Sequence, residues 1–296
     1  MLETRAPVFL VWCTTILRGI GQVIFQGHAG TGAFFLTGLA VSSPFMAGGA
    51  LLGSAIGAAL ATLLKFDRRE TEDGIHGFNP TLVGVAVLFF LDPGQILFWV
   101  LLIVGCVVST IVCYLMRQFI TFPTYTAPFV VCTWILFLTA HLLVGPTIDH
   151  PARAAQTDFT LHTFFGKVAA GDAEVMFGAN TLTGCLFLVG VAISSWRHAV
   201  ILFVGSFVGT LAAIYHNDPE GTIQIGIYGY NSALAAVAVY LWRKSLLHPI
   251  LAALVAVPLT ELFPKGLGIP ALTAPFVVSA WILLAIGCLE TYFCTD

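Results

Sequence analysis

The two halves of this chain carry the same short sequence. Residues 126–131, Thr-Ala-Pro-Phe-Val-Val, recur letter for letter at residues 273–278, and Trp134 recurs as Trp281 at the same spacing. Further matches lie 152 positions apart: Gly77-Phe78-Asn79 with Gly229-Tyr230-Asn231, and Gln22-Val23 with Glu174-Val175. Such self-similarity indicates two structural repeats, which we place at residues 1–147 and 148–296. In an apolar chain, repeats of this kind often enclose a transport pathway.

Composition points to lipid as the solvent of this chain. It is 58% hydrophobic and only 9% charged, against roughly a quarter charged in soluble domains. We therefore expect a multi-pass protein of a cell membrane, surrounded by membrane lipid. The 12 Lys and Arg form no basic stripe and the net charge is -3, so nucleic acid is excluded as a partner.

The apolar runs predict an all-α integral membrane protein. A helix that crosses a bilayer needs about 20 apolar residues, and the candidate runs are 6–20, 30–43, 45–64, 95–116, 127–145, 181–193, 199–215, 246–263 and 274–293. Two runs at corresponding positions, 81–91 and 231–242, are too short to span, which favours a binding site at mid-membrane. The most polar stretch, 146–173, is predicted to be an extramembrane connection. Glycines at positions 49, 53, 57, 205 and 209 predict close helix packing.

No enzyme motif is present in the sequence. The chain lacks a Gly-x-Ser-x-Gly elbow, a phosphate-binding Gly-rich loop with Lys, and a His-Glu-x-x-His zinc motif. We therefore expect neither catalytic residues nor a metal or cofactor, and the enzyme class is set aside.

Polar groups inside apolar runs are the informative ones, because burying them without a partner costs several kcal/mol. Four stand out, in two equivalent pairs: Gln22 with Glu174, and Thr126 with Thr273. If the repeats fold alike around a pseudo-two-fold axis, the members of each pair face each other across one shared pathway. In the alternative interpretation, the threonines only cap helices and Glu174 belongs to a buried structural pair.

Aromatic residues accompany these polar pairs in both halves, namely Phe25, Phe78, Phe177 and Tyr230. A flat slot walled by rings, with acceptor oxygens along its edges and no cation, suits a small, planar, neutral molecule with several N–H donors. It suits a hydrated ion poorly, because nothing in it replaces a hydration shell.

These motifs together resemble the urea transporter family. The resemblance rests on Leu17 to Gln26, Gly77-Phe78-Asn79 with Leu82, Gly226 to Ser232, and both Thr-Ala-Pro-Phe copies, and it extends from about residue 9 to 290. It implies two inverted repeats of about five transmembrane helices, with re-entrant pore half-helices. It also implies a homotrimer with one pore per protomer, and downhill movement of urea without ion or ATP coupling, as in a channel of the bacterial inner membrane.

The resemblance also implies roles for individual residues. Gln22 and Glu174 would lie beside pore helices whose carbonyls accept urea N–H groups. The slots would be shaped by Phe25, Phe78, Leu82, Phe177, Tyr230 and Leu234. The narrow middle would be lined by Val23, Thr126, Val175 and Thr273. Tyr230 departs from the family, which commonly has Phe there, and so adds a hydroxyl in or beside one slot. Pro80, where a small residue is common, is a second departure.

Two alternatives remain open at this stage. One is a facilitator for another small neutral solute, such as a short amide or ammonia. The other is a proton-coupled transporter with Glu174 as the titrating group, although the sequence shows no second membrane carboxylate to act as its relay partner.

Overall fold

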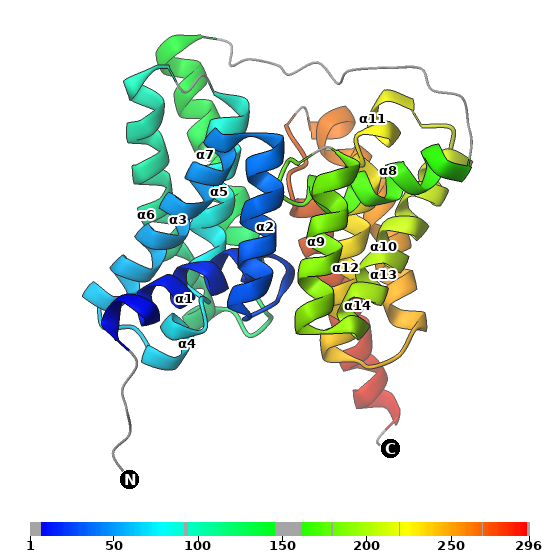
Figure 1. The fold of residues 1–296 in the computed structure, drawn as a ribbon. Helices are drawn as coiled ribbons and strands as arrows, with labels where there is room; N and C mark the ends of the chain where they lie inside the picture. The colour runs from blue at the N-terminus through cyan, green and yellow to red at the C-terminus, as the bar shows by residue number, and fades with distance from the viewer. Residues whose placement is uncertain are drawn as a thin grey trace.

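The first half of the chain folds into a bundle of helices. The computed structural model describes residues 7–91, 94–145, 161–178, 180–218, 220–267 and 269–294, and every regular element in these ranges is helical. The first half comprises α1 (Val8–Gly21), η1 (Gln22–Ile24), α2 (Ala29–Ser42), α3 (Pro44–Leu63), α4 (Arg68–Glu72), α5 (Phe78–Phe90), α6 (Ile96–Phe119) and α7 (Ala127–Val144) (Figure 1).

The second half repeats this succession of long and short helices. It comprises α8 (Leu161–Glu174), α9 (Thr181–Ser194), α10 (Trp196–Tyr215), α11 (Glu220–Gln224), α12 (Ile227–Trp242), α13 (Leu247–Glu261), η2 (Leu262–Leu267) and α14 (Ala274–Cys294). Each apolar run predicted from the sequence is confirmed as a helix, and so are the two short helices α5 and α12.

Four helices in the described residues are long and apolar enough to cross a membrane: α3, α6, α10, and α13 together with most of η2. A fifth span is made if α1 with η1 and α2, which meet at a bend of 75°, are counted as one broken crossing. The described part of the chain therefore has the helices of a multi-pass membrane protein, and several of them are shorter than a bilayer.

The second part of the predicted extramembrane connection is a packed helix. Residues 146–160 lie outside the described residues, but residues 161–174 form α8, which packs against α9, α10 and α12. Lys167 and Asp172 lowered the hydropathy of this segment, yet both side chains are buried, at 6% and 0% exposure. Lys167 reaches Glu220 at the start of α11 with an N–O distance of 2.9 Å, so its charge is paired.

Equivalent serines begin equivalent long helices. The Ser43 hydroxyl accepts the backbone N–H of Met46 at the start of α3, and the Ser195 hydroxyl accepts that of His198 at the start of α10. Such caps satisfy donors that a helix start leaves without intrahelical partners. The chain turns at these two points from one helix into the next with no intervening loop.

Small residues bring the helices of each half into backbone contact, as predicted. A methyl group at Gly49 would overlap the carbonyl of Gly84, and one at Gly53 would overlap the carbonyl of Pro80. In the second half, Gly209 lies against the carbonyl of Tyr228. The pairs α3–α5 and α10–α12 are therefore close because their contact surfaces have no side chains between the backbones.

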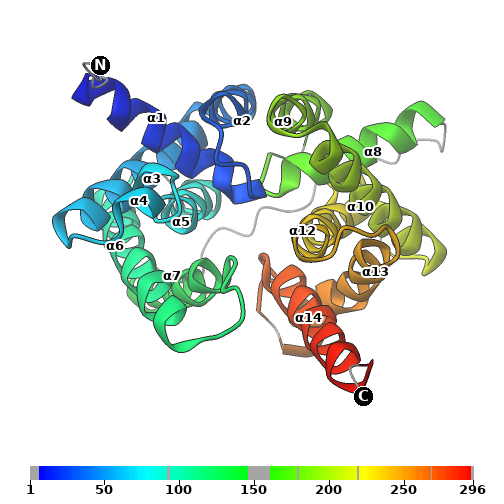
Figure 2. The same cartoon turned by 90° about the horizontal axis from the view of Figure 1, so that it is seen from below.

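The two halves meet along two seams, and both seams are reciprocal. In the first, the Thr31 hydroxyl donates to the carbonyl of Gly190 at 2.6 Å, and the Thr183 hydroxyl donates to that of Gly38 at 2.9 Å. This seam joins α2 to α9, and the rings of Phe35 and Phe187 pack within it with centroids 4.5 Å apart and their planes tilted by 34°. Figure 2 shows α2 and α9 side by side.

The second seam joins the ends of the repeated motif. The Trp134 indole donates to the carbonyl of Pro270, and the Trp281 indole donates to that of Pro123, both at 2.8 Å. Each tryptophan thus holds the loop that precedes the other half's Thr-Ala-Pro-Phe helix. Seen from below, α7 and α14 approach each other across the molecule from the α2–α9 seam (Figure 2).

Gly53 and Gly48 provide a matched test of the close α3–α5 contact. Gly53→Ala should lower the melting temperature of the purified protein by several degrees, because the colliding Pro80 carbonyl belongs to backbone that cannot swing away. Gly48, in the same helix, has nothing within 4 Å of an added methyl. Gly48→Ala should leave the temperature unchanged or slightly raised, since Ala favours a helix over Gly by about 1 kcal/mol. Equal melting temperatures for the two variants would contradict the proposed contact.

A candidate solute pathway between the halves

The two equivalent threonines meet at the centre of the molecule. Their hydroxyl oxygens lie 2.6 Å apart, and both side chains are buried. Thr126 precedes α7, but its side chain makes no capping hydrogen bond to that helix. The interpretation that Thr126 only caps α7 is therefore wrong. Its hydroxyl instead contacts the hydroxyl of the other half.

Two asparagines perform the capping that the threonines do not. The Asn79 side-chain oxygen accepts the backbone N–H of Phe129 at 3.0 Å, and that of Asn231 accepts Phe276 at 3.1 Å. Their amide nitrogens donate to the carbonyls of Tyr125 and Leu272. Each asparagine thus fastens the start of α7 or α14, together with the residue before its threonine.

Asn79 and Asn231 were missed as site residues in the sequence, although both stand in the repeated Gly-Phe-Asn and Gly-Tyr-Asn motifs. The available signal was an amide side chain inside an apolar run, because such a group needs a hydrogen-bonding partner. Nothing in the sequence indicates that the partner is the backbone of another helix.

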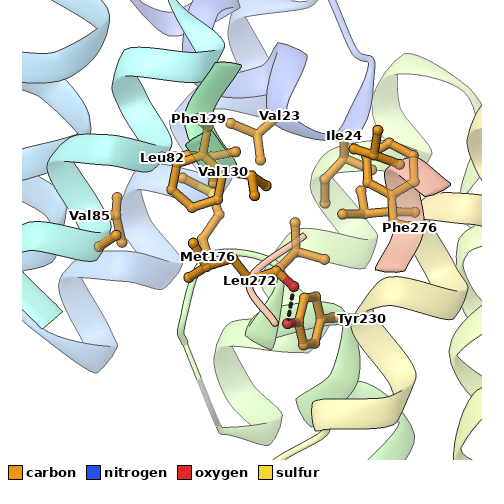
Figure 3. Packing of buried hydrophobic residues seen from close by; sticks show 14 of the residues in the cluster. Val23, Ile24, Leu82, Val85, Phe129, Val130, Met176, Tyr230, Leu272 and Phe276 are labelled. Atoms are coloured by element: carbon orange, nitrogen blue, oxygen red, sulfur yellow. Dashed lines mark hydrogen bonds between the residues drawn. The ribbon is translucent and has the colours of Figure 1, made fainter. Parts of the chain in front are cut away.

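The residues around the threonine pair are closely packed. Val23 and Val175 are each 1% exposed, and Leu82 and Leu234 are completely buried. Figure 3 shows Val23 near Phe129 and Val130, and Ile24 next to Phe276, with Met176 and Leu272 below Val130. The centre is therefore a closely packed region in which apolar side chains surround two hydroxyl groups; it is the candidate constriction.

Phe25 lies at one end of this constriction and is partly exposed. Its ring meets the edges of Tyr125 and Phe276, with centroids 5.8 Å and 5.9 Å away. Phe25 has a φ of 58°, in the left-handed region, which a non-glycine residue adopts at a cost. Its backbone is set by the turn that ends η1, where its N–H donates to the Gln22 carbonyl.

Phe177 lies at the other end, in the equivalent backbone conformation with a φ of 59°. Its ring stacks on Phe89 with centroids 5.0 Å apart and meets the edge of Phe90 at 5.4 Å. A cavity of about 380 Å³ opens here. It is lined by Ser42, Ser43, Met46, Leu88, Phe89, Phe177, Gly178 and Asn180.

The pair formed by Gln22 and Glu174 does not meet as the threonines do. Gln22 is partly exposed and donates to the carbonyl of Asp73 at 2.9 Å, within its own half. Glu174 is 6% exposed and lies within electrostatic reach of the Tyr230 hydroxyl, again within its own half. The expectation that these two side chains face each other across the pathway stays a prediction.

Tyr230 and Phe78 occupy equivalent positions with different surroundings. The Tyr230 hydroxyl donates to the carbonyl of Leu272, next to Thr273 (Figure 3). The added hydroxyl therefore supports the loop of the second half. Phe78 is partly exposed and packs against the common core, as do Phe25 and Phe177.

A second buried carboxyl group is present in the described residues, contrary to the expectation from the sequence. Asp172 in α8 is fully buried, and both of its oxygens lack a hydrogen-bonding partner among the described residues. Asp172 precedes Glu174 by two positions. Because successive helical residues are about 100° apart, the two carboxyl groups point to opposite sides of α8. They do not form an adjacent pair.

Taken together, the site offers apolar walls, ring edges at both ends and two opposed hydroxyls in the middle. These groups give a small neutral solute dispersion contacts and hydrogen bonds.

The chain is similar to known proteins over most of its length. A family model described as Urea transporter matches residues 13–287, a range that contains every candidate pathway residue. Urea transporter 1 of Ovis aries is 26% identical over 306 residues, which cover 95% of this chain and 78% of that protein, and the Capra hircus protein of the same name matches equally. Urea transporter 1 of Rattus norvegicus is 28% identical over 246 residues, covering 79% of this chain and 64% of that protein.

The hydrogen bonds of Asn79 and Asn231 to the starts of α7 and α14 should contribute to stability. Asn79→Ala should leave the Phe129 N–H and the Tyr125 carbonyl unpaired, at about 1–3 kcal/mol for each buried group that stays unsatisfied. Thermal unfolding should show a lower melting temperature for Asn79→Ala, and similarly for Asn231→Ala. Ser109→Ala is the matched control, because that buried hydroxyl bonds only to the Cys106 carbonyl of its own helix. If the melting temperature of Asn79→Ala is no lower than that of Ser109→Ala, the hydrogen bonds of Asn79 do not stabilise the start of α7.

Proposed function

The chain belongs to the urea transporter family, and we propose that it conducts urea passively, down the urea concentration gradient, through the constriction at Thr126 and Thr273. It is a membrane transport protein and not an enzyme, as the family and the apolar helices show. The channel mechanism and the filter residues are the proposal.

One observation carries this proposal, namely the contact between the Thr126 and Thr273 hydroxyls in the buried centre. On either side of it, the partly exposed rings of Phe25 and Phe177 lead outward, and the Phe177 side opens into a cavity. Accessibility thus falls from both ends toward one polar point. A route with this profile has its barrier at the threonines.

The chemistry of the constriction suits urea. A urea molecule that leaves water loses several hydrogen bonds, and each unmet donor in a dry site costs about 1–3 kcal/mol. The two hydroxyls hydrogen-bond to each other when the site is empty. A passing urea exchanges this single bond for bonds to both oxygens, so the protein is not left with unpaired polar groups. The valines and rings contact the flat faces of the solute.

We further propose that the halves are inverted repeats with re-entrant half-helices. In Figure 1, α1 lies at the lower left and its counterpart α8 at the upper right, and α7 and α14 run in opposite directions. The reciprocal threonine and tryptophan bonds between the halves support the same symmetry. In this arrangement, Gln22 and Glu174 belong to opposite ends of the route.

The assembly is proposed to be a homotrimer in lipid, with one pore per protomer. Both halves expose large apolar side chains, for example Ile103 and Val104 on α6 and Leu251 and Leu254 on α13. These surfaces suit lipid tails or neighbouring protomers. The bacterial inner membrane stays a prediction, because the matching relatives are mammalian.

The alternatives differ from urea conduction in measurable ways. Another small neutral solute, such as a short amide or ammonia, fits the same walls. Proton coupling through Glu174 gains one supporting observation, the second buried carboxyl of Asp172. The opposite orientation of the two groups on α8 argues against a direct relay between them.

Downhill transport is tested with labelled urea in proteoliposomes. Influx should follow the gradient and ignore an imposed membrane potential, because the term of about 2.3 kcal/mol per charge per 100 mV does not act on a neutral solute. Accumulation against the gradient that an uncoupler abolishes would establish proton coupling instead.

Glu174→Gln keeps an acceptor and should retain more urea flux than Glu174→Leu. Equal loss in both variants would assign Glu174 a structural role.

The threonine constriction is tested by Thr126→Val and Thr273→Val. Each change removes a hydroxyl at nearly constant width, and the lost 1–3 kcal/mol predicts flux slower by roughly fivefold to a hundredfold, since about 1.4 kcal/mol is tenfold in rate. The double variant should be slower than either. Flux is normalised to folded protein.

Thr133→Val is the matched control for this test. Thr133 lies in α7, is fully buried, and has a hydroxyl with no partner in the described part of the chain. Its replacement should leave urea flux unchanged. Unchanged flux per folded protomer in the Thr126→Val/Thr273→Val double variant would remove both threonines from the pathway.

A further inference from the structure

The two halves differ at Tyr125, a residue beside the proposed pathway. It directly precedes Thr126, and its counterpart before Thr273 is Leu272. Both residues have a φ of 46°, and both carbonyls accept a bond from the asparagine of their own half. The backbones are therefore alike, and only the first half places a phenol at this point.

The ring of Tyr125 is held by aromatic neighbours from both halves. It meets Phe25 with centroids 5.8 Å apart at an interplanar angle of 75°, and Phe276 with centroids 5.2 Å apart at 57°. These contacts involve the ring and leave the hydroxyl out. The ring position is thus fixed independently of the hydroxyl group.

The hydroxyl of Tyr125 has no hydrogen-bonding partner among the described residues, and it is not one of their enclosed polar atoms. It therefore retains access to open space at the Phe25 end. Tyr230 differs in this respect, because its hydroxyl is committed to the Leu272 carbonyl.

We propose that the Tyr125 hydroxyl is a solute-binding group at the Phe25 end of the pathway, where it donates a hydrogen bond to the carbonyl oxygen of the solute. This inference rests on the proposed function. The carboxylate of Glu174 is only an acceptor and suits the N–H groups of urea, whereas a phenol is a donor for its oxygen. Tyr125 therefore selects amide-type solutes with a C=O group.

The donor role predicts discrimination between urea and thiourea. The two solutes share their N–H donors, but sulfur is a weaker hydrogen-bond acceptor than oxygen. Removing the phenol hydroxyl should therefore weaken the binding of urea more than the binding of thiourea. The Phe177 end lacks a counterpart of Tyr125, because Leu272 carries no polar group.

The experiment compares Tyr125→Phe with the wild type in proteoliposomes, over a range of urea and thiourea concentrations. The variant keeps the ring and its packing. The concentration of urea for half-maximal flux should rise by about threefold to tenfold, the worth of one net hydrogen bond, while that of thiourea changes less. Tyr114→Phe is the matched control, because that ring stacks on Phe66 with centroids 3.8 Å apart, away from the candidate pathway. It should behave as the wild type.

The outcomes separate this inference from the function on which it rests. If the wild type conducts urea and Tyr125→Phe matches it for both solutes, the donor role is wrong and urea conduction stands. Equal changes in the half-maximal concentrations of urea and thiourea would also overturn the donor role, because they would indicate a general effect on the shape of the Phe25 end of the pathway. Absence of urea flux through the wild type would overturn the proposed function and this inference together.

Discussion

The starts of α7 and α14 meet at the centre because an asparagine from a neighbouring helix satisfies each of them. A helix start leaves backbone N–H groups without partners, and burying them in a membrane is costly. Asn79 and Asn231 supply the acceptor, and they hold the preceding carbonyl with the same amide. The threonine hydroxyls are thereby released from capping, and they are free to meet each other. The narrow middle of the proposed route depends on this arrangement.

The framework of the molecule is symmetric, whereas the lining of the proposed route is not. Seam contacts are exchanged in both directions between the halves, through Thr31 and Thr183 and through Trp134 and Trp281. At the route itself, Gln22 stands opposite Glu174 in the repeat, and Tyr125 opposite Leu272. The two ends of the route therefore differ in charge and in hydrogen-bonding capacity.

Tyr230 and Lys167 show how a polar group in an apolar chain is kept in place. The Tyr230 hydroxyl is bonded to the Leu272 carbonyl, and the Lys167 amine is paired with Glu220. Each of these bonds also fixes a segment near the proposed route: the loop before α14, and α8 against α11. Asp172 is the exception, since neither of its oxygens has a partner in the described ranges. Asp172 is thus buried without a partner, whereas Lys167 in the same helix is buried with its charge paired.

The sequence by itself determined the repeat, the helices and the equivalence of Thr126 with Thr273, because apolar runs and matched motifs are local properties of the chain. It did not indicate that residues 161–174 form a packed helix, because Lys167 and Asp172 lower the hydropathy of that segment. Only the tertiary structure decided that Asn79 caps a distant helix, that Gln22 donates to the Asp73 carbonyl, and that Tyr125 keeps an unbonded hydroxyl. These outcomes depend on which backbone groups from remote parts of the chain come within hydrogen-bonding distance, and local residue patterns carry no record of that distance.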